Sequence, residues 1–330
     1  MRKVNVFLTT KISQENARRI ENADPAVKLT SIAKLSAAER SGNVDATAEL
    51  NALLPQAEVA FGLRFPRDMI SRSPNLKWIQ VFMAGVDGFK AKGLLPDHIT
   101  FTKTAGIQAA AMAEAIICRM LMFAKNTHLY YETKLDKKWE RHESITLKGK
   151  TLGILGLGNV GKELARMAKA FGMRVIANRR SAKKEGHTRN VDLLLPSSEL
   201  HRLLQESDFV ALTLPLTPDT KNMIGRDEFA AMKNGAYIIN VSRGQIVDEE
   251  AMIEALEISQ IAGAGLDVFA VEPLPQTSRL WEMPNVIISP HVAASMDGYP
   301  ERATELFCEN LRRYIDGRKL LNVVDKETGY

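Results

Sequence analysis

A glycine-rich segment, GLGNVG at residues 156–161, is the part of the chain whose residue types and spacing predict chemistry most directly. It follows the apolar run 151–155 and precedes the helix-like stretch 162–171. A G-x-G-x-x-G string is typical of dinucleotide binding when it lies between a strand and a helix in this order. We therefore predict a dinucleotide site, with a glycine turn in an ordinary βα unit as the alternative.

Each glycine of this segment has a separate physical task in such a site. Gly156 permits the tight turn, Gly158 lets the backbone approach a pyrophosphate, and Gly161 lets the helix pack closely on the strand. Asn159 and Val160 are expected cofactor contacts as well, and the predicted helix follows them. Its N-terminus offers unpaired N–H groups and the positive end of a dipole to phosphates.

A basic loop follows the second predicted strand of this unit, residues 174–178. A protein that binds NAD usually places Asp or Glu there, and its carboxylate accepts hydrogen bonds from the ribose 2′-OH. This chain has Arg179, Arg180 and Ser181 instead, which can bind a 2′-phosphate through charge-assisted hydrogen bonds. We therefore expect NADP(H) to be preferred and NAD(H) to be possible. A solvated basic loop is the alternative.

Two further side chains follow predicted strands at positions where they could act on a ligand. Arg243 comes after the strand 236–240, and His291 comes after the strand 286–288. In a doubly wound sheet, the loops after the carboxyl ends of the strands face the ligand. A guanidinium there suits an anion, and an imidazole can donate or accept a proton. Taken singly, a structural ion-pair arginine and a hydrogen-bonded structural histidine are the more common cases.

The elements that must position these residues form an α/β pattern, in which apolar runs alternate with helix-like segments. In the first part we expect strands at 4–8, 27–32, 58–63 and 78–83, and helices at 13–22 and 45–53. A long helix is predicted at about 107–130, and an amphipathic helix at 301–314. Between them we expect strands at 151–155, 174–178, 209–213, 236–240, 263–267 and 286–288.

The composition is that of an ordinary globular protein long enough for two domains, with 330 residues, 45% of them hydrophobic and 25% charged. The net charge of +5 is spread along the chain, so we expect no nucleic-acid partner. The apolar segment 105–124 contains Gln108, Glu114 and Arg119, which favours a buried helix over a membrane span. We expect no signal peptide, no metal site and no disulfide between the two isolated cysteines, and we expect a cytoplasmic protein.

Four further segments, read together with the glycine motif, resemble the D-isomer-specific 2-hydroxyacid dehydrogenase family. They are LPLTPDT at 214–220, NVSRG at 240–244, GLDVF at 265–269 with Glu272-Pro273 close behind, and SPHVA at 289–293. The resemblance covers more than half of the chain. It implies an α/β fold of two Rossmann-like, doubly wound domains.

The resemblance also implies how these domains are arranged along the chain. A flavodoxin-like substrate domain would consist of residues 1–102 and 296–330, and a dinucleotide-binding domain of residues 103–295 would be inserted into it. Members of the family commonly form homodimers through their nucleotide domains, so a homodimer is expected.

Arg243, Glu272 and His291 would be the catalytic set of such an enzyme. Arg243 would hold the carboxylate and the C2 carbonyl oxygen of a 2-oxo acid. His291 would contact the substrate and give a proton to that oxygen, while a nicotinamide supplies the hydride. Glu272 would fix which ring nitrogen of His291 faces the substrate, although an isolated glutamate before a proline would be interpreted as a solvated turn.

The resemblance assigns binding roles outside this set as well. The segment 81–87 resembles the family's substrate loop, in which backbone N–H groups of Met83, Ala84 and Gly85 would bind the carboxylate. The side chains of Phe82 and Met83 would shape the pocket. Further expected cofactor contacts are Leu214, Pro215, Thr220, Val241 and Asp267. For the aspartate, which would contact the nicotinamide carboxamide, the alternative is a residue that caps a turn.

We therefore expect an NADP(H)-dependent reductase of 2-oxo acids that forms D-2-hydroxy acids, with glyoxylate and hydroxypyruvate as leading substrates. A 3-phosphoglycerate dehydrogenase is an alternative, although 330 residues leave no room for the regulatory domain that many of those carry. A formate dehydrogenase is disfavoured because Glu272 stands where a glutamine is expected. A dinucleotide-sensing scaffold, like the corepressors that share this fold, is disfavoured by the absence of long disordered flanks.

Overall fold

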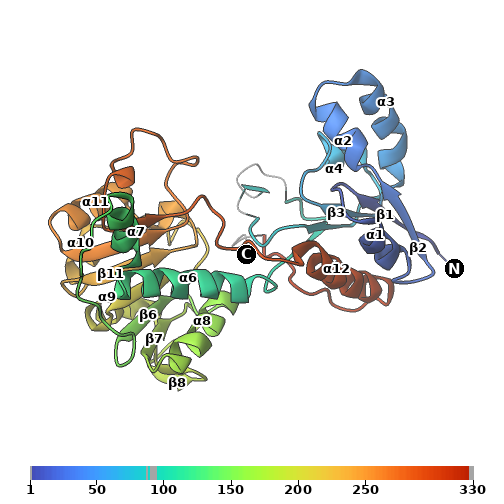
Figure 1. Ribbon diagram of the computed structural model, residues 1–330. Helices are drawn as coiled ribbons and strands as arrows, with labels where there is room; N and C mark the ends of the chain where they lie inside the picture. The colour runs from blue at the N-terminus through green and yellow to red at the C-terminus, as the bar shows by residue number, and fades with distance from the viewer. Residues whose placement is uncertain (1, 87, 90–94, 327–330) are drawn as a thin grey trace. The chain divides into compact units, whose positions relative to one another are not determined.

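The computed structural model describes residues 2–86, 88–89 and 95–326. The chain forms two compact units, one made of Met1–Ile107 with Asp297–Tyr330 and the other made of Gln108–Met296. We call them the first and the second domain (Figure 1). The assignment of residues 1–102 and 296–330 to substrate binding, and of 103–295 to dinucleotide binding, stays a prediction.

A five-stranded parallel sheet forms the centre of the first domain. Its strand order is β2-β1-β3-β4-β5, the flavodoxin-like doubly wound order. Parallel strands covered on both faces are continuous apolar runs, and every residue of β3 and β4 is buried. The strands are β1 (Val4–Leu8), β2 (Val27–Ser31), β3 (Val59–Gly62), β4 (Trp78–Val81) and β5 (Thr100–Lys103).

The C-terminal helix belongs to this first domain, although the second domain separates it from the rest in sequence. It lies beside α1, as Figure 1 shows in red and blue. Its Phe307 ring stacks on Phe61 at a centroid distance of 4.2 Å, and its Asn310 Nδ2 donates to Gln80 Oε1 at 2.9 Å. The helices are α1 (Gln14–Glu21), α2 (Ala33–Arg40), α3 (Val44–Leu53), α4 (Met69–Arg72) and α12 (Tyr299–Ile315).

The second domain contains an eight-stranded sheet of order β13-β12-β11-β10-β6-β7-β9-β8. The part from β9 to β12 has the Rossmann order, and only β8 runs antiparallel to its neighbour among the described pairs. The first strands are β6 (Thr151–Leu155), β7 (Arg174–Asn178), β8 (Gly186–Thr188) and β9 (Val191–Leu195). The others are β10 (Phe209–Leu212), β11 (Ala236–Asn240), β12 (Ile261–Leu266) and β13 (Val286–Ile288).

Helices cover both faces of this second sheet. Ile116, Met120 and Leu164 pack from α6 and α8 on one face, and Leu203 and Phe229 pack from α9 and α10 on the other. Both predicted doubly wound domains are therefore observed. The helices are α6 (Ala109–Ala124), α7 (Thr127–Leu135), α8 (Asn159–Ala170), α9 (Leu200–Glu206), α10 (Arg226–Ala231) and α11 (Glu249–Glu257).

The prediction of one long helix at about 107–130 is wrong. The helix ends at Ala124, and α7 starts a new helix at Thr127. Between them Asn126 has a φ of 53°, a left-handed conformation that asparagine adopts more readily than most residues. The four residues at the break, 125–128, are polar, and the prediction extended the helix across them.

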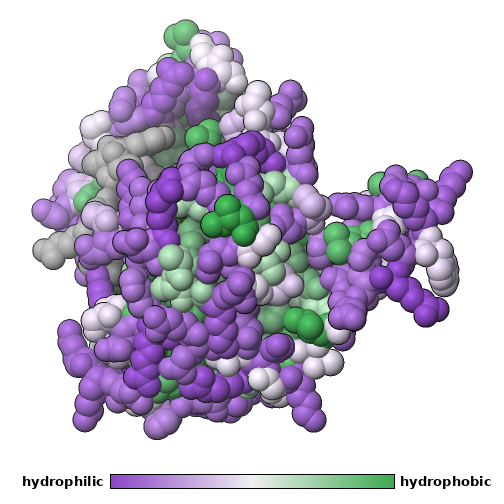
Figure 2. All heavy atoms as spheres, turned by 90° about the vertical axis from the view of Figure 1, so that its left-hand side faces the viewer, coloured by the Kyte–Doolittle hydropathy of each residue, from purple (hydrophilic) through white to green (hydrophobic). Residues whose placement is uncertain are grey.

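The surface in Figure 2 is largely hydrophilic, and its hydrophobic residues form small separate groups. Large exposed hydrophobic side chains occur in and just after α7, where Tyr131 is 62%, Leu135 66% and Trp139 94% exposed. Within the described ranges, none of the helices has the length and apolar character that a membrane span requires.

Candidate active site

The glycine segment forms the turn between β6 and α8, as the sequence predicted. Gly156 has a φ of +97°, and a Cβ atom there would stand 2.9 Å from Leu214 Cβ. Gly161 packs against the carbonyl oxygen of Gly156, so a side chain would not fit between helix and strand. At Gly158, by contrast, a Cβ would meet nothing within 4 Å. The turn is therefore tight on its protein side and open where a phosphate could approach.

Asn178, the last residue of β7, joins this turn to the basic loop. Its Oδ1 accepts a hydrogen bond from the Gly156 N–H at 3.2 Å, and its backbone oxygen accepts one from the Leu157 N–H at 3.1 Å. The side chain is buried, and sequence reasoning did not identify it. The available signal was a polar residue that ends an apolar strand.

The basic loop begins directly after Asn178, next to the glycine turn. Arg179 is half-buried, whereas Arg180 and Ser181 are exposed. Arg179 Nε is buried and has no hydrogen-bond partner among the described residues. Guanidinium groups beside an open helix N-terminus form a donor set that fits the phosphates of a dinucleotide.

Arg243 lies on a short loop whose backbone is fixed by Asn240. Asn240 Oδ1 accepts from the Ser242 N–H at 3.0 Å, and its Nδ2 donates to the Arg243 carbonyl at 2.9 Å. The Ser242 hydroxyl donates to the Leu212 carbonyl at 2.7 Å, which ties the loop to β10. Arg243 is half-buried, and its Nη1 donates to the Ser242 carbonyl at 2.8 Å. The backbone therefore binds one nitrogen of the guanidinium, and the side chain is partly exposed to solvent.

His291 and Glu272, distant in sequence, form a pair in the structure. His291 Nδ1 lies 2.8 Å from Glu272 Oε2, while Glu272 Oε1 accepts from the Phe269 N–H at 3.1 Å. The carboxylate is thus fixed from both oxygens. Because Nδ1 faces Glu272, Nε2 is the nitrogen that can exchange a proton with a ligand.

A close backbone contact holds the Arg243 loop against the Glu272 loop. A Cβ atom at Gly244 would overlap the carbonyl group of Phe269, so only glycine fits there. Gln245 Nε2 donates to the Ala270 carbonyl at 2.9 Å and strengthens the same contact. The loops after β11 and β12 therefore form one unit.

Asp267 is buried and lies at the centre of a hydrogen-bond network behind His291. Its carboxylate accepts from the backbone N–H groups of Val292 at 3.0 Å and Ala293 at 2.8 Å, and from the Ser289 hydroxyl. Its Oδ1 also lies 3.4 Å from Arg119 Nη2. This arrangement is that of a turn-capping aspartate, the alternative noted from the sequence, and the expected carboxamide contact stays a prediction.

Known proteins were compared with this chain, and a family model matches more than half of it. The model described as "D-isomer specific 2-hydroxyacid dehydrogenase, NAD binding domain" matches residues 117–293. This span contains the glycine turn, the basic loop and the Arg243, Glu272 and His291 loops. The chain belongs to the D-isomer-specific 2-hydroxyacid dehydrogenase family.

Named relatives in this family support the assignment. A glyoxylate reductase of Thermococcus litoralis is 34% identical over 270 residues, covering 79% of this chain and 80% of that protein. A D-3-phosphoglycerate dehydrogenase of Methanocaldococcus jannaschii is 30% identical over 325 residues, covering 98% of this chain and 59% of that protein.

Solved structures of the family have the same fold over the whole chain. A D-isomer specific 2-hydroxyacid dehydrogenase from Xanthobacter autotrophicus, in complex with NADPH and MES, has a TM-score of 0.84 and 30% identity, with 100% of both chains covered. An NADPH-dependent glyoxylate/hydroxypyruvate reductase from Sinorhizobium meliloti, in complex with NADP and sulfate, has a TM-score of 0.82 and 29% identity, covering 99% of this chain and 100% of that one. The predicted family, fold and enzyme class are confirmed, and the chain is an NAD(P)-dependent dehydrogenase.

The expected substrate loop lies in the first domain. Phe82 packs its ring against Phe61 and Tyr299, and Met83 packs against the core of that domain, so both side chains have structural contacts. The Met83 carbonyl accepts from the Thr104 N–H at 2.9 Å. Ala84 and Gly85 are half-buried, and the expected loop residue at position 87 lies outside the described residues. The substrate contacts of Met83, Ala84 and Gly85 stay predictions.

The remaining expected cofactor residues have clear places in the second domain of this family member. Leu214 packs against the glycine turn, and the Thr220 hydroxyl donates to the Pro215 carbonyl at 2.8 Å, which closes a turn after β10. Val241 is buried in the core. Asn159 is exposed and Val160 half-buried at the start of α8. The described part of the chain holds no group of three or more His, Cys, Asp or Glu side chains that could bind a metal ion.

Proposed function

We propose that this dehydrogenase reduces a small 2-oxo acid to a D-2-hydroxy acid with NADP(H), and that glyoxylate or hydroxypyruvate is its substrate. The observation that carries the proposal is the His291–Glu272 pair, with Nδ1 and Oε2 2.8 Å apart. Such a pair makes His291 a proton donor of fixed orientation, and it lies in the domain that contains the glycine turn.

Arg243 serves as the substrate's anion-binding residue. Its backbone is fixed by Asn240 and its Nη1 by the Ser242 carbonyl. The partly exposed guanidinium can bind the carboxylate of a 2-oxo acid and polarise the C2 carbonyl as negative charge develops on its oxygen. His291 then gives its proton to that oxygen, and Glu272 stabilises the charge that the imidazole carries before transfer.

The basic loop binds the 2′-phosphate of the cofactor. Arg179 and Arg180 offer charge-assisted hydrogen bonds, and Ser181 adds a hydroxyl. When bound, the reduced nicotinamide supplies the hydride. NADPH and NADP in the structures of the relatives from X. autotrophicus and S. meliloti support this preference.

Initial rates with a panel of acids test the substrate and the cofactor together. Purified protein is given NADPH or NADH with glyoxylate, hydroxypyruvate, pyruvate, bulkier 2-oxo acids and phosphohydroxypyruvate, and oxidation of the cofactor is followed. We expect NADPH-selective turnover of glyoxylate or hydroxypyruvate. Turnover of phosphohydroxypyruvate alone would instead favour the activity named for the M. jannaschii relative.

A variant of His291 links the observed pair to this turnover. His291→Asn keeps a polar side chain of similar reach but cannot deliver a proton, so kcat should fall about 10²–10⁴-fold while NADPH binding is kept. A variant with nearly normal kcat would remove His291 from the mechanism. NADPH binding by the wild type without turnover of any acid would favour a sensing scaffold.

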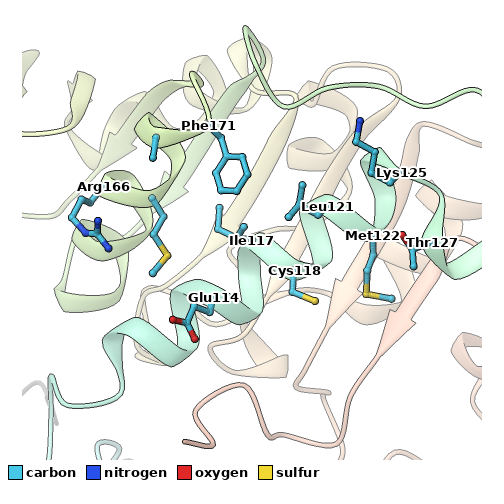
Figure 3. A pocket seen from close by; sticks show the side chains of 11 residues that line it. Glu114, Ile117, Cys118, Leu121, Met122, Lys125, Thr127, Arg166 and Phe171 are labelled. Atoms are coloured by element: carbon cyan, nitrogen blue, oxygen red, sulfur yellow. The ribbon is translucent and has the colours of Figure 1, made fainter.

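We also propose that the enzyme is a homodimer, formed through the face of α6 and α8. Ile117, Leu121 and Phe171 point into an apolar hollow between these helices, and charged side chains lie at its ends (Figure 3). A second copy of the chain would bury this hollow and the exposed hydrophobic residues of α7, in line with the family's use of the nucleotide domain. Light scattering should give twice the chain mass of 36.6 kDa, and Leu121→Arg should give the mass of a monomer.

A further inference from the structure

Arg119 is a buried cation behind the His291 turn to which the proposed mechanism gives no role. It lies on α6 and is 7% exposed. Its Nη1 donates to the Ala115 carbonyl at 2.7 Å, and its Nη2 lies 3.4 Å from Asp267 Oδ1 and donates to the Ser289 hydroxyl. Burial lowers the pKa of Arg119 and the Asp267 charge opposes that shift, but an arginine in a protein keeps its charge.

Packing alone does not explain this arginine. Its Nε is buried and has no hydrogen-bond partner among the described residues, which is unfavourable for folding. The neighbouring strand also makes room for it, because a Cβ at Gly265 would stand 2.9 Å from Arg119 Cδ. An apolar side chain would fill the same space without leaving a polar group unsatisfied.

The groups that Arg119 contacts control the backbone on both sides of His291. Ser289 precedes the histidine, and the Asp267 carboxylate accepts from the two N–H groups that follow it, those of Val292 and Ala293. His291 itself has a φ of 53°, a left-handed conformation that is uncommon for residues other than glycine. Its own N–H donates to the Asp267 carbonyl at 2.8 Å.

We propose that Arg119 is a positioning residue for His291, which it orients through Asp267 and Ser289. The Asp267 carboxylate, which lies beside the Arg119 guanidinium, accepts from the Ser289 hydroxyl and from the N–H groups of Val292 and Ala293, and it therefore fixes the turn from both sides. The inference rests on the proposed function, because it takes His291 as the proton donor. The contacts that link Arg119 to the turn do not depend on that function.

Three variants of the enzyme test this role. Arg119→Met removes the charge and keeps an unbranched chain, Arg119→Lys keeps a charge, and Ser289→Ala removes the hydroxyl. Arg174→Met is the matched control, because Arg174 belongs to the same domain but forms a surface ion pair with Glu206 at 2.8 Å. The measurements are kcat and KM for glyoxylate, the NADPH Kd, and hydrogen exchange of the segment 289–293.

A misplaced His291 should slow the chemical step without weakening the cofactor. We expect kcat of Arg119→Met to fall about 10- to 100-fold, with an NADPH Kd within about threefold of the wild type. Arg119→Lys should recover part of the loss, and Ser289→Ala should lower kcat about fivefold, the effect of one hydrogen bond. Hydrogen exchange should accelerate in residues 289–293 for Arg119→Met and Ser289→Ala. Arg174→Met should change neither kcat nor this exchange.

Either of two results with Arg119→Met would overturn the proposal. One is an Arg119→Met enzyme whose kcat and exchange match those of Arg174→Met. The other is a parallel loss of kcat and NADPH binding with faster exchange throughout the second domain, which would mark a general structural residue. If Arg119→Met does not fold, unchanged kcat and exchange in Ser289→Ala refute the role.

Failure of the proposed function gives a different pattern from failure of this inference. In that case the wild type reduces no 2-oxo acid, while exchange in 289–293 still reports whether Arg119 holds the His291 turn.

Discussion

The contact at Gly244 gives the sharpest prediction, because it holds the Arg243 and Glu272 loops together. In Gly244→Ala the added Cβ would fall well inside 3.0 Å of the Phe269 carbonyl, and ordinary contact begins at 3.4 Å. The atoms it meets are backbone, so no flexible side chain can give way. To restore contact, the backbone at 269–270 must move by more than about 1 Å.

That movement has a calculable effect on rate and stability. Phe269 N–H holds Glu272 Oε1, so Glu272 and with it His291 would shift relative to Arg243. A misplacement of about 1 Å costs about 100-fold in rate, which is about 2.7 kcal/mol in activation free energy. Overpacking should lower the free energy of unfolding by about 1–3 kcal/mol, and each kcal/mol should lower Tm by about 2–4 °C.

The assay is a comparison of kcat with NADPH and glyoxylate, alongside thermal unfolding. Gly186→Ala is the matched control, since a Cβ there meets nothing within 4 Å, and both kcat and Tm should stay unchanged. A Gly244→Ala enzyme with kcat within about twofold of the wild type would refute the reasoning, because it would show that separating these loops does not affect catalysis.

Three other predictions follow from the site and its surroundings. Replacing Arg179 and Arg180 together by Ala should weaken NADPH binding about 10- to 100-fold and leave NADH binding nearly unchanged. Fluorescence titration measures both dissociation constants. Equal weakening of NADPH and NADH binding would contradict a 2′-phosphate site. Gly158→Ala should fold with unchanged Tm, because its Cβ has open space, yet bind NADPH more weakly since the phosphate approach is blocked; unchanged Kd would place the pyrophosphate elsewhere. Burial raises the pKa of Cys308 to about 11, so its thiol stays protonated and unreactive below that pH. Labelling with iodoacetamide at pH 8 should therefore reach Cys308 only after unfolding. Rapid labelling of Cys308 in the folded enzyme would show that this thiol is accessible.

The sequence predicted those features that depend on residues close together in the chain. The glycine segment was predicted to connect a strand and a helix, and it connects β6 to α8, because tight turns and helix starts follow from local residue types. Arg243 and His291 were predicted to follow strands, and they follow β11 and β13, since buried parallel strands are continuous apolar runs. At Asn126 the prediction was wrong, because it extended one helix across the polar residues 125–128, where the chain ends α6 and begins α7.

Tertiary structure decided which distant residues support the site. Arg119 and Asp267 are separated by 148 positions, and in the sequence the arginine indicated only that its helix was no membrane span. Asn178 and Gly244 act through contacts with the Gly156 turn and the Phe269 backbone, and no local pattern identifies these partners. The physical reason is that periodicity and turn chemistry record neighbours along the chain. Hydrogen bonds and steric limits between loops, in contrast, exist only after the sheet has placed the ends of its strands side by side.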